Sequence, residues 1–116
     1  MLGVVDRRVY GPEEVIIREG DTGDSFYLIE KGQVGIWKES AAGPILIGQI
    51  GAGGIFGEMA LVDDQPRMAQ AKALVDTNCV IIKRERVRAR IDAADPLVQA
   101  LLRIFVQNIR SLTRDP

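Results

Sequence analysis

Between Val15 and Arg84 the chain is a series of short apolar runs separated by Gly, Asp and Pro, and this pattern constrains its fold more than any other feature. Short runs rich in Val, Ile, Tyr and Phe, bounded by turn residues, are typical of β-strands. The predicted strands are residues 15–18, 26–30, 34–38, 45–50, 55–56, 69–75 and 78–83. The turns at residues 20–24 and 30–33 are tight, which favours antiparallel neighbours and a compact sandwich or barrel.

The pattern changes after Arg84. Residues 84–91 suit a short helix, and Asp95 followed by Pro96 suits the start of a second helix that we expect to end near Thr113. Two apolar stripes follow this second helix, one with 4-3-4-3 spacing (Val98, Leu102, Phe105, Ile109, Leu112) and one beside it (Leu97, Leu101, Ile104). One stripe can cover the barrel, and the other packs in the same core or contacts a second chain as a homodimer. The sequence leaves both options open.

Composition limits the classes of function. The 116 residues are 47% apolar and 27% charged, which suits one soluble domain with one hydrophobic core spanning residues 1–116. The net charge of −1 lacks the basic field of a nonspecific nucleic-acid binder, so we expect no direct nucleic-acid contact by this chain. No apolar run approaches the length of a membrane span, so we expect no membrane partner and a cytoplasmic location.

The chain has no histidine and a single cysteine. The lack of histidine removes the usual general base and the commonest transition-metal ligand, so we expect no enzymatic activity, no metal and no cofactor. Cys79 lies in an apolar run and is interpreted as a buried thiol rather than a reactive one. Three aromatic residues on predicted strands are interpreted as core filling rather than as stacking on a ligand: Tyr27, Trp37 and Phe56. The acidic turn at residues 21–24 lacks the ligand spacing of a calcium loop and is interpreted as structural.

The segment over residues 51–70 carries the candidate chemistry. A Gly-rich approach and a short strand lead to Gly57, which opens one helical turn, and Arg67 then leads into the next strand. A helix start presents unpaired backbone N–H groups, and a guanidinium offers a fork of donors that matches phosphate oxygens. Glu58 would repel a phosphate, but its carboxylate can accept a hydrogen bond from a sugar hydroxyl. The three residues together indicate a ligand with a phosphate beside a ribose hydroxyl.

This segment resembles the phosphate-binding cassette of the cyclic-nucleotide-binding domain family, through residues 56–61 (FGEMAL) and 66–69 (PRMA). The resemblance extends upstream through residues 17–21, 24–29 and 32–34, and covers residues 10–113 overall. It implies a mostly β domain with C-terminal α structure: a double-stranded β-helix (jelly-roll) barrel over residues 10–83, followed by two helices over residues 84–113. The related sensor domains belong to the catabolite-activator and protein kinase A regulatory-subunit type.

The resemblance also implies the roles of the site residues. Arg67 would pair with the cyclic phosphate, Glu58 with the ribose 2′-hydroxyl, and the backbone of Gly57 and of the residues after Arg67 would add hydrogen bonds. The implied ligand-binding residues are Phe56, Gly57, Glu58, Met59, Ala60, Arg67, Met68 and Ala69. Ligand binding would move the cassette and the last helix, and Asn108, Ser111 and Thr113 are polar candidates to cover the base.

Cyclic AMP is the favoured ligand, with cyclic GMP as the alternative. Cyclic-GMP-selective members place a threonine in this part of the cassette, and neither Met68 nor Ala69 supplies a hydroxyl. Two further readings stay open. In the first, Arg67 and Glu58 pair with each other on a ligand-free jelly-roll interaction module, and in the second the chain is the sensor fragment of a transcription regulator without its DNA-binding domain.

Overall fold

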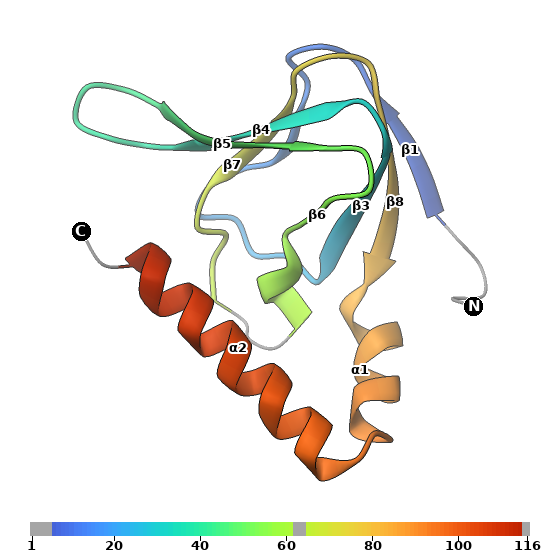
Figure 1. Ribbon diagram of the computed structural model, residues 1–116. Coiled ribbons are helices and arrows are strands. Elements are labelled where there is room, and N and C mark those ends of the chain that lie inside the picture. The colour runs from blue at the N-terminus through green and yellow to red at the C-terminus, as the bar shows by residue number, and fades with distance from the viewer. Residues whose placement is uncertain (1–5, 62–64, 115–116) are drawn as a thin grey trace.

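The computed structural model describes residues 6–61 and 65–114, which form two four-stranded sheets followed by two helices (Figure 1). The elements in chain order are β1 (Asp6–Tyr10), β2 (Val15–Ile17), β3 (Ser25–Lys31), β4 (Gln33–Lys38), β5 (Ile45–Gly51), β6 (Ile55–Phe56), the 3-10 helix η1 (Glu58–Leu61), β7 (Gln70–Ala73), β8 (Thr77–Lys83), α1 (Arg84–Asp92) and α2 (Pro96–Arg114). No helix in the described residues has both the length and the apolar character needed to cross a bilayer.

The two sheets have the strand orders β1-β8-β3-β6 and β2-β7-β4-β5, and the paired strands are antiparallel. The chain passes repeatedly from one sheet to the other, because β3 and β6 belong to the first sheet and β4, β5 and β7 to the second. This crossing of strands between two packed sheets is the jelly-roll arrangement, and it confirms the predicted fold class.

The core lies between the sheets, where alternate residues of the strands point inward. Its main cluster contains Ile29, Val34, Ala73 and Cys79, each at most 1% exposed. A second cluster of Phe26, Val80 and Ile82 packs with Val87 of α1 and so attaches the first helix to the barrel. The predicted burial of the Cys79 thiol is confirmed.

The strand β1 was not among the predicted strands. Its residues Asp6, Arg7, Arg8 and Val9 are exposed, and only Tyr10 is buried, so the sequence lacks the apolar alternation of a half-buried strand. Its backbone nevertheless pairs with β8, which has apolar residues of its own to hold the sheet together. Among the described residues, the first sheet therefore includes Asp6–Tyr10.

Two other details differ from the predictions. β7 ends at Ala73, so Val75, placed in a strand by its β-branched side chain, lies beyond the strand and is exposed. Trp37, interpreted as core filling, is half-buried and lies outside both core clusters, with its ring 4.9 Å from the Lys72 ammonium. Strand propensity alone does not determine which face of a sheet a side chain joins.

The start of α2 follows the predicted capping pattern. The Asp95 carboxylate accepts a hydrogen bond from the Leu97 N–H at 2.8 Å, and Pro96 occupies the first helical position, where it needs no N–H partner. In Figure 1, α2 turns back from α1 and runs below η1 in the view. Members of both predicted apolar stripes are exposed: Leu97, Val98, Leu101, Leu102, Ile104 and Phe105. The expectation that one stripe covers the barrel is therefore wrong for the described residues.

Burial of Cys79 makes the stability of the fold sensitive to alkaline pH. Burial raises the pKa of this thiol from 9.0 to about 11, so the thiol stays neutral in the folded chain while it ionises in the unfolded chain. We therefore expect the free energy of unfolding to fall by about 2 kcal/mol as pH rises from 9 to 11. Urea unfolding of the wild type and Cys79→Ala at several pH values measures this term. An equal slope in the two proteins would contradict it.

Candidate functional site

A cavity of about 290 Å³ opens beside the Gly57 turn. This volume is at the lower end of the range for small-molecule sites. Seven of the eight predicted site residues line it: Phe56, Gly57, Glu58, Met59, Arg67, Met68 and Ala69. The side chain of the eighth, Ala60, lies outside the described residues. The predicted residues are therefore brought together around one cavity, although they span two separate segments of the chain.

Gly57 shapes the local backbone at this cavity. Its φ of 76° lies in the left-handed region, which only glycine adopts at little cost, and η1 begins at the next residue. A Cβ at this position would also lie 3.0 Å from Nη1 of Arg67. The predicted glycine-led helical turn is confirmed, and it lies against the arginine that the sequence analysis paired with it.

Arg67 is half-buried and held by backbone carbonyl groups. Its Nη2 donates to the Ser25 carbonyl oxygen at 2.7 Å, and its Nη1 donates to the Gly57 carbonyl oxygen at 3.1 Å. Burial lowers the pKa of this guanidinium, while the Tyr27 hydroxyl and the Asp24 carboxylate act in the opposite direction. Arginine nevertheless remains protonated near neutral pH. Within the residues that the structure describes, these two bonds use two of the five guanidinium donors, which leaves other donors for an anion.

The turn before β3 also holds Arg67 in place. The Arg67 N–H donates to the Asp21 carbonyl at 2.8 Å, and the Arg67 carbonyl accepts from the Gly20 N–H at 2.8 Å. Gly23 lies against the side chain, because a Cβ there would be 2.5 Å from Nη2. Sequence reasoning interpreted this turn only as a structural connection. The turn holds Arg67 through contacts between residues more than forty positions apart in the sequence, and no local sequence pattern reveals such contacts.

Glu58 is half-buried and lines the same cavity as Arg67. The cavity therefore carries a cation and a carboxylate, and Ile36, Ile47 and Ile50 add an apolar wall. An arginine can bind an anionic group, a carboxylate can accept from a hydroxyl, and an apolar wall can pack against a flat ring. This set of groups suits a small ligand with one charged end and one apolar end.

Phe56 has a mainly structural position. It is 3% exposed and stacks on Tyr27, with ring centroids 4.9 Å apart and planes 6° from parallel. The expectation that core filling dominates for this aromatic pair is confirmed, and Phe56 meets the cavity from the core side.

Two polar residues that the sequence analysis did not identify also line the cavity, namely Lys38 and Gln65. Lys38 lies at the end of β4 among exposed polar residues, where the sequence offers no sign of a site. Of the candidate covering residues on α2, Asn108 is exposed, and the side chains of Ser111 and Thr113 lie outside the described residues. Within the described part of the chain, no cluster of three or more His, Cys, Asp or Glu side chains could hold a metal ion.

The fold is thus a two-sheet jelly roll, and an arginine and a carboxylate lie on one of its cavities. A family model described as the cyclic nucleotide-binding domain matches residues 7–93. The cAMP-dependent protein kinase regulatory subunit of Dictyostelium discoideum is 32% identical over 98 residues, which are 81% of this chain and 30% of the relative. The chain therefore belongs to the cyclic nucleotide-binding domain family, and its sequence is similar to regulatory subunits that contain this domain.

Solved structures agree with this assignment. The EAL enzyme Bd1971 in its cAMP-bound form matches with a TM-score of 0.85 and 37% identity, over 93% of this chain and 29% of that chain. Its cGMP-bound form matches equally well, at 38% identity over 94% of this chain and 29% of that chain. The catabolite activator protein of Thermus thermophilus matches with a TM-score of 0.78 and 32% identity, over 97% of this chain and 53% of that chain. This chain spans less than a third of the length of the kinase regulatory subunits it matches.

The close packing of Arg67 against Gly23 leads to a prediction. Gly23→Ala adds a methyl group where the guanidinium now lies, and the flexible side chain can move away at little cost to folding. We expect cyclic nucleotide affinity to fall about tenfold, the size of one displaced charge-assisted contact, with a small change in melting temperature. Calorimetric titration measures the affinity. Gly11→Ala, which meets no atom within 4 Å, is the matched control, and equal affinities in the two variants would contradict the prediction.

Proposed function

We propose that this domain is a cyclic nucleotide sensor that favours cyclic AMP and regulates a partner or an attached domain rather than catalysing a reaction. The observation that carries the proposal is that Arg67 and Glu58 line the same cavity, one able to bind the phosphate and the other the ribose hydroxyl. In this proposal the domain works in the cytoplasm. The relatives with regulatory names support the regulatory role.

The environment of Arg67 supports an anionic ligand. Among the described residues, its side-chain hydrogen bonds go to the neutral carbonyl groups of Ser25 and Gly57, while burial disfavours its charge. A cyclic phosphate would bring the opposite charge to a half-buried cation, where screening by water is reduced. The N–H groups around Gly57 and after Arg67 would complete the phosphate contacts, and Glu58 would accept from the ribose 2′-hydroxyl.

The preference for cyclic AMP rests on the side chains that follow Arg67. Met68 and Ala69 have no hydroxyl group to contact a guanine amino group, and both line the cavity. Cyclic GMP remains the second ligand of the proposal, since the related enzyme Bd1971 has been solved with each nucleotide.

Signal transfer in this proposal depends on the cassette and α2. A ligand shifts an equilibrium only by its differential affinity for the two states. Burial of one of the exposed α2 stripes against the liganded cavity would provide such a difference, with residues near Asn108 covering the base.

A second candidate function is favoured by α2 itself. The apolar residues exposed on α2, such as Leu101 and Phe105, form a surface that suits a protein partner. We propose a homodimer through α2, compatible either with nucleotide sensing or with a ligand-free interaction module. In a third hypothesis, the chain is the sensor part of a transcription regulator whose DNA contacts come from another domain.

Removal of the Arg67 guanidinium tests the site directly. We expect Arg67→Ala to lose about 1.5 to 3 kcal/mol of binding free energy, roughly ten- to a hundredfold in affinity for cyclic AMP. Glu58→Ala should weaken the binding of cyclic AMP, whereas 2′-deoxy cyclic AMP should bind Glu58→Ala and the wild type alike, since both changes delete one contact. Calorimetry measures all of these. The control Arg7→Ala removes an exposed guanidinium on β1.

Three results would count against the sensor. The first is a wild-type chain that responds to neither nucleotide at millimolar concentration, which would leave the ligand-free module. The second is an Arg67→Ala variant that binds as tightly as Arg7→Ala. The third is a Glu58→Ala variant that discriminates against the 2′-deoxy ligand as strongly as the wild type does.

The homodimer is tested by a charge on the exposed stripe. Phe105 is 56% exposed, so Phe105→Glu should fold as the wild type does but should place buried charges in the dimer interface. We expect sedimentation of the wild type as a dimer and of Phe105→Glu as a monomer. Val9→Glu, at a position 69% exposed on β1, should remain dimeric. A monomeric wild type at micromolar concentration would exclude this interface.

A further inference from the structure

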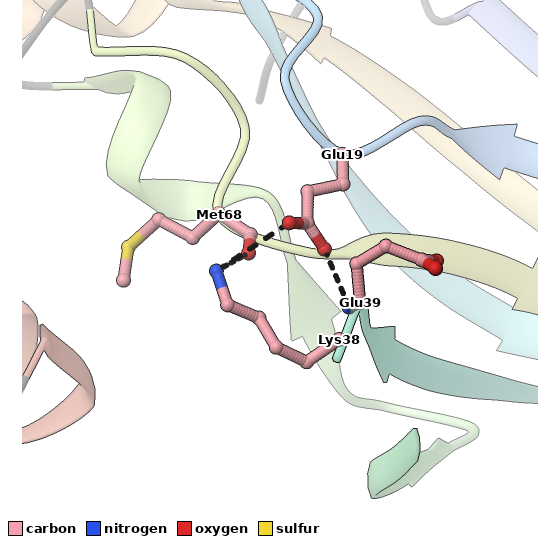
Figure 2. Close-up of polar contacts among 4 residues, drawn as sticks. All are labelled: Glu19, Lys38, Glu39 and Met68. Carbon is pink, nitrogen blue, oxygen red and sulfur yellow. Dashed lines mark hydrogen bonds and ion pairs between the residues drawn. The ribbon is translucent and has the colours of Figure 1, made fainter. Parts of the chain in front are cut away.

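Lys38 links β4 to the segment that follows Arg67. The antiparallel register pairs Trp37 with Gln70, which brings the next residue of β4 alongside the residues before β7. The Lys38 ammonium donates a hydrogen bond to the Met68 carbonyl oxygen at 2.6 Å (Figure 2). Lys38 and Met68 both line the cavity. The lysine therefore contacts the main chain of the candidate phosphate site.

Glu19 contacts both the Lys38 side chain and the backbone of the next residue. Its Oε2 lies 3.7 Å from the Lys38 ammonium, and its Oε1 accepts from the Glu39 N–H at 3.0 Å, as Figure 2 shows. The residue after Glu19 is Gly20, whose N–H donates to the Arg67 carbonyl. We call Glu19, Lys38 and the Met68 carbonyl the Lys38 bridge. It joins three segments that are distant in sequence. Together with the Gly20 contact, it holds the two successive carbonyl groups of Arg67 and Met68.

The bridge fixes the direction of one peptide group. A trans peptide is planar, so its C=O and N–H point in opposite directions. The Met68 carbonyl shares its peptide with the Ala69 N–H, and holding the carbonyl toward Lys38 holds this N–H in the opposite direction. Ala69 also lines the cavity. The orientation of a backbone donor beside the candidate phosphate site is thus set by a lysine on another strand.

The bridge contributes little to stability by itself. The side chains of Lys38 and Glu19 are 47% and 31% exposed, and ion pairs this open to water add little to the free energy of unfolding. Removal of the bridge should therefore affect geometry at the cavity more than the stability of the fold.

We propose that Lys38, supported by Glu19, is a positioning residue that orients the Met68–Ala69 peptide for contact with an exocyclic phosphate oxygen of the ligand. This inference rests on the proposed function, because the peptide acts on a ligand phosphate. Lys38 acts through the peptide and is not itself a phosphate ligand.

The test compares Lys38→Met, Lys38→Arg and Glu19→Gln with Lys31→Met, which removes an exposed lysine charge at the end of β3. The ligands are cyclic AMP and its two phosphorothioate diastereomers, in which sulfur replaces one or the other exocyclic oxygen. We expect Lys38→Met to bind cyclic AMP about fivefold more weakly, which corresponds to one misdirected hydrogen bond. Lys38→Arg should restore most of the affinity, Glu19→Gln should lose about twofold, and Lys31→Met should match the wild type.

The ratio of affinities for the two diastereomers separates positioning from a general structural effect. Sulfur at the oxygen that faces the Ala69 N–H already weakens that bond, so Lys38→Met should cost this diastereomer little and the other one about fivefold. An unchanged ratio, with equal losses for every ligand, would overturn the proposal. Wild-type affinities in Lys38→Met would overturn it as well. If Lys38→Met does not fold, Glu19→Gln takes its place. The same shift of the affinity ratio in Glu19→Gln would support the proposal, and an unchanged ratio would overturn it.

The wild type and Arg67→Ala separate this inference from the proposed function. If the wild type binds cyclic AMP, Arg67→Ala weakens it and Lys38→Met changes nothing, only the role of Lys38 is wrong. If the wild type binds none of the three ligands, both proposals fail.

Discussion

The contact of the Arg67 side chain with two backbone carbonyls is the interaction on which the site depends. Ser25 begins β3 and Gly57 follows β6, both in the first sheet, while Arg67 precedes β7 in the second sheet. One guanidinium thus joins the two sheets at the edge of the cavity. Partial burial of a cation is costly, and carbonyl dipoles offset only part of that cost. In the proposed function, an anionic ligand would offset the rest of that cost.

The glycines around this side chain are explained by the same constraint. A side chain at Gly23 or Gly57 would meet the guanidinium, and the φ of Gly57 also starts η1, which carries Glu58. The position of the carboxylate is therefore coupled to the position of the cation through one short turn. Opposite charges can then face different parts of one ligand rather than simply neutralise each other. In the proposed function, this coupling would relate the packing of the barrel to selectivity for a phosphate beside a hydroxyl.

The sequence predicted what is encoded locally. Alternating apolar runs located seven of the eight strands, Asp95 and Pro96 located the start of α2, and the segment with Gly57, Glu58 and Arg67 identified the cavity, because those signals lie within short stretches. The strand Asp6–Tyr10 was missed because its pairing with β8 depends on backbone bonds rather than on apolar alternation. The contacts of Arg67 with Ser25 and of Lys38 with Met68 were missed for a related reason: each requires a strand register that only the folded chain defines.

The cassette is therefore only partly a local motif. Its residues supply the charged groups, but its backbone is held by the turn at Gly20 and Asp21 on one side and by Lys38 on the other. Donors must be aimed within a fraction of an ångström to bind an anion well, and a segment that leads from a loop into a strand does not provide such accuracy alone. The barrel instead holds the segment through the turn between β2 and β3 and through Lys38 at the end of β4. Under the proposed roles of Arg67 and Lys38, ligand selectivity would then depend on residues outside the motif by which the site is recognised.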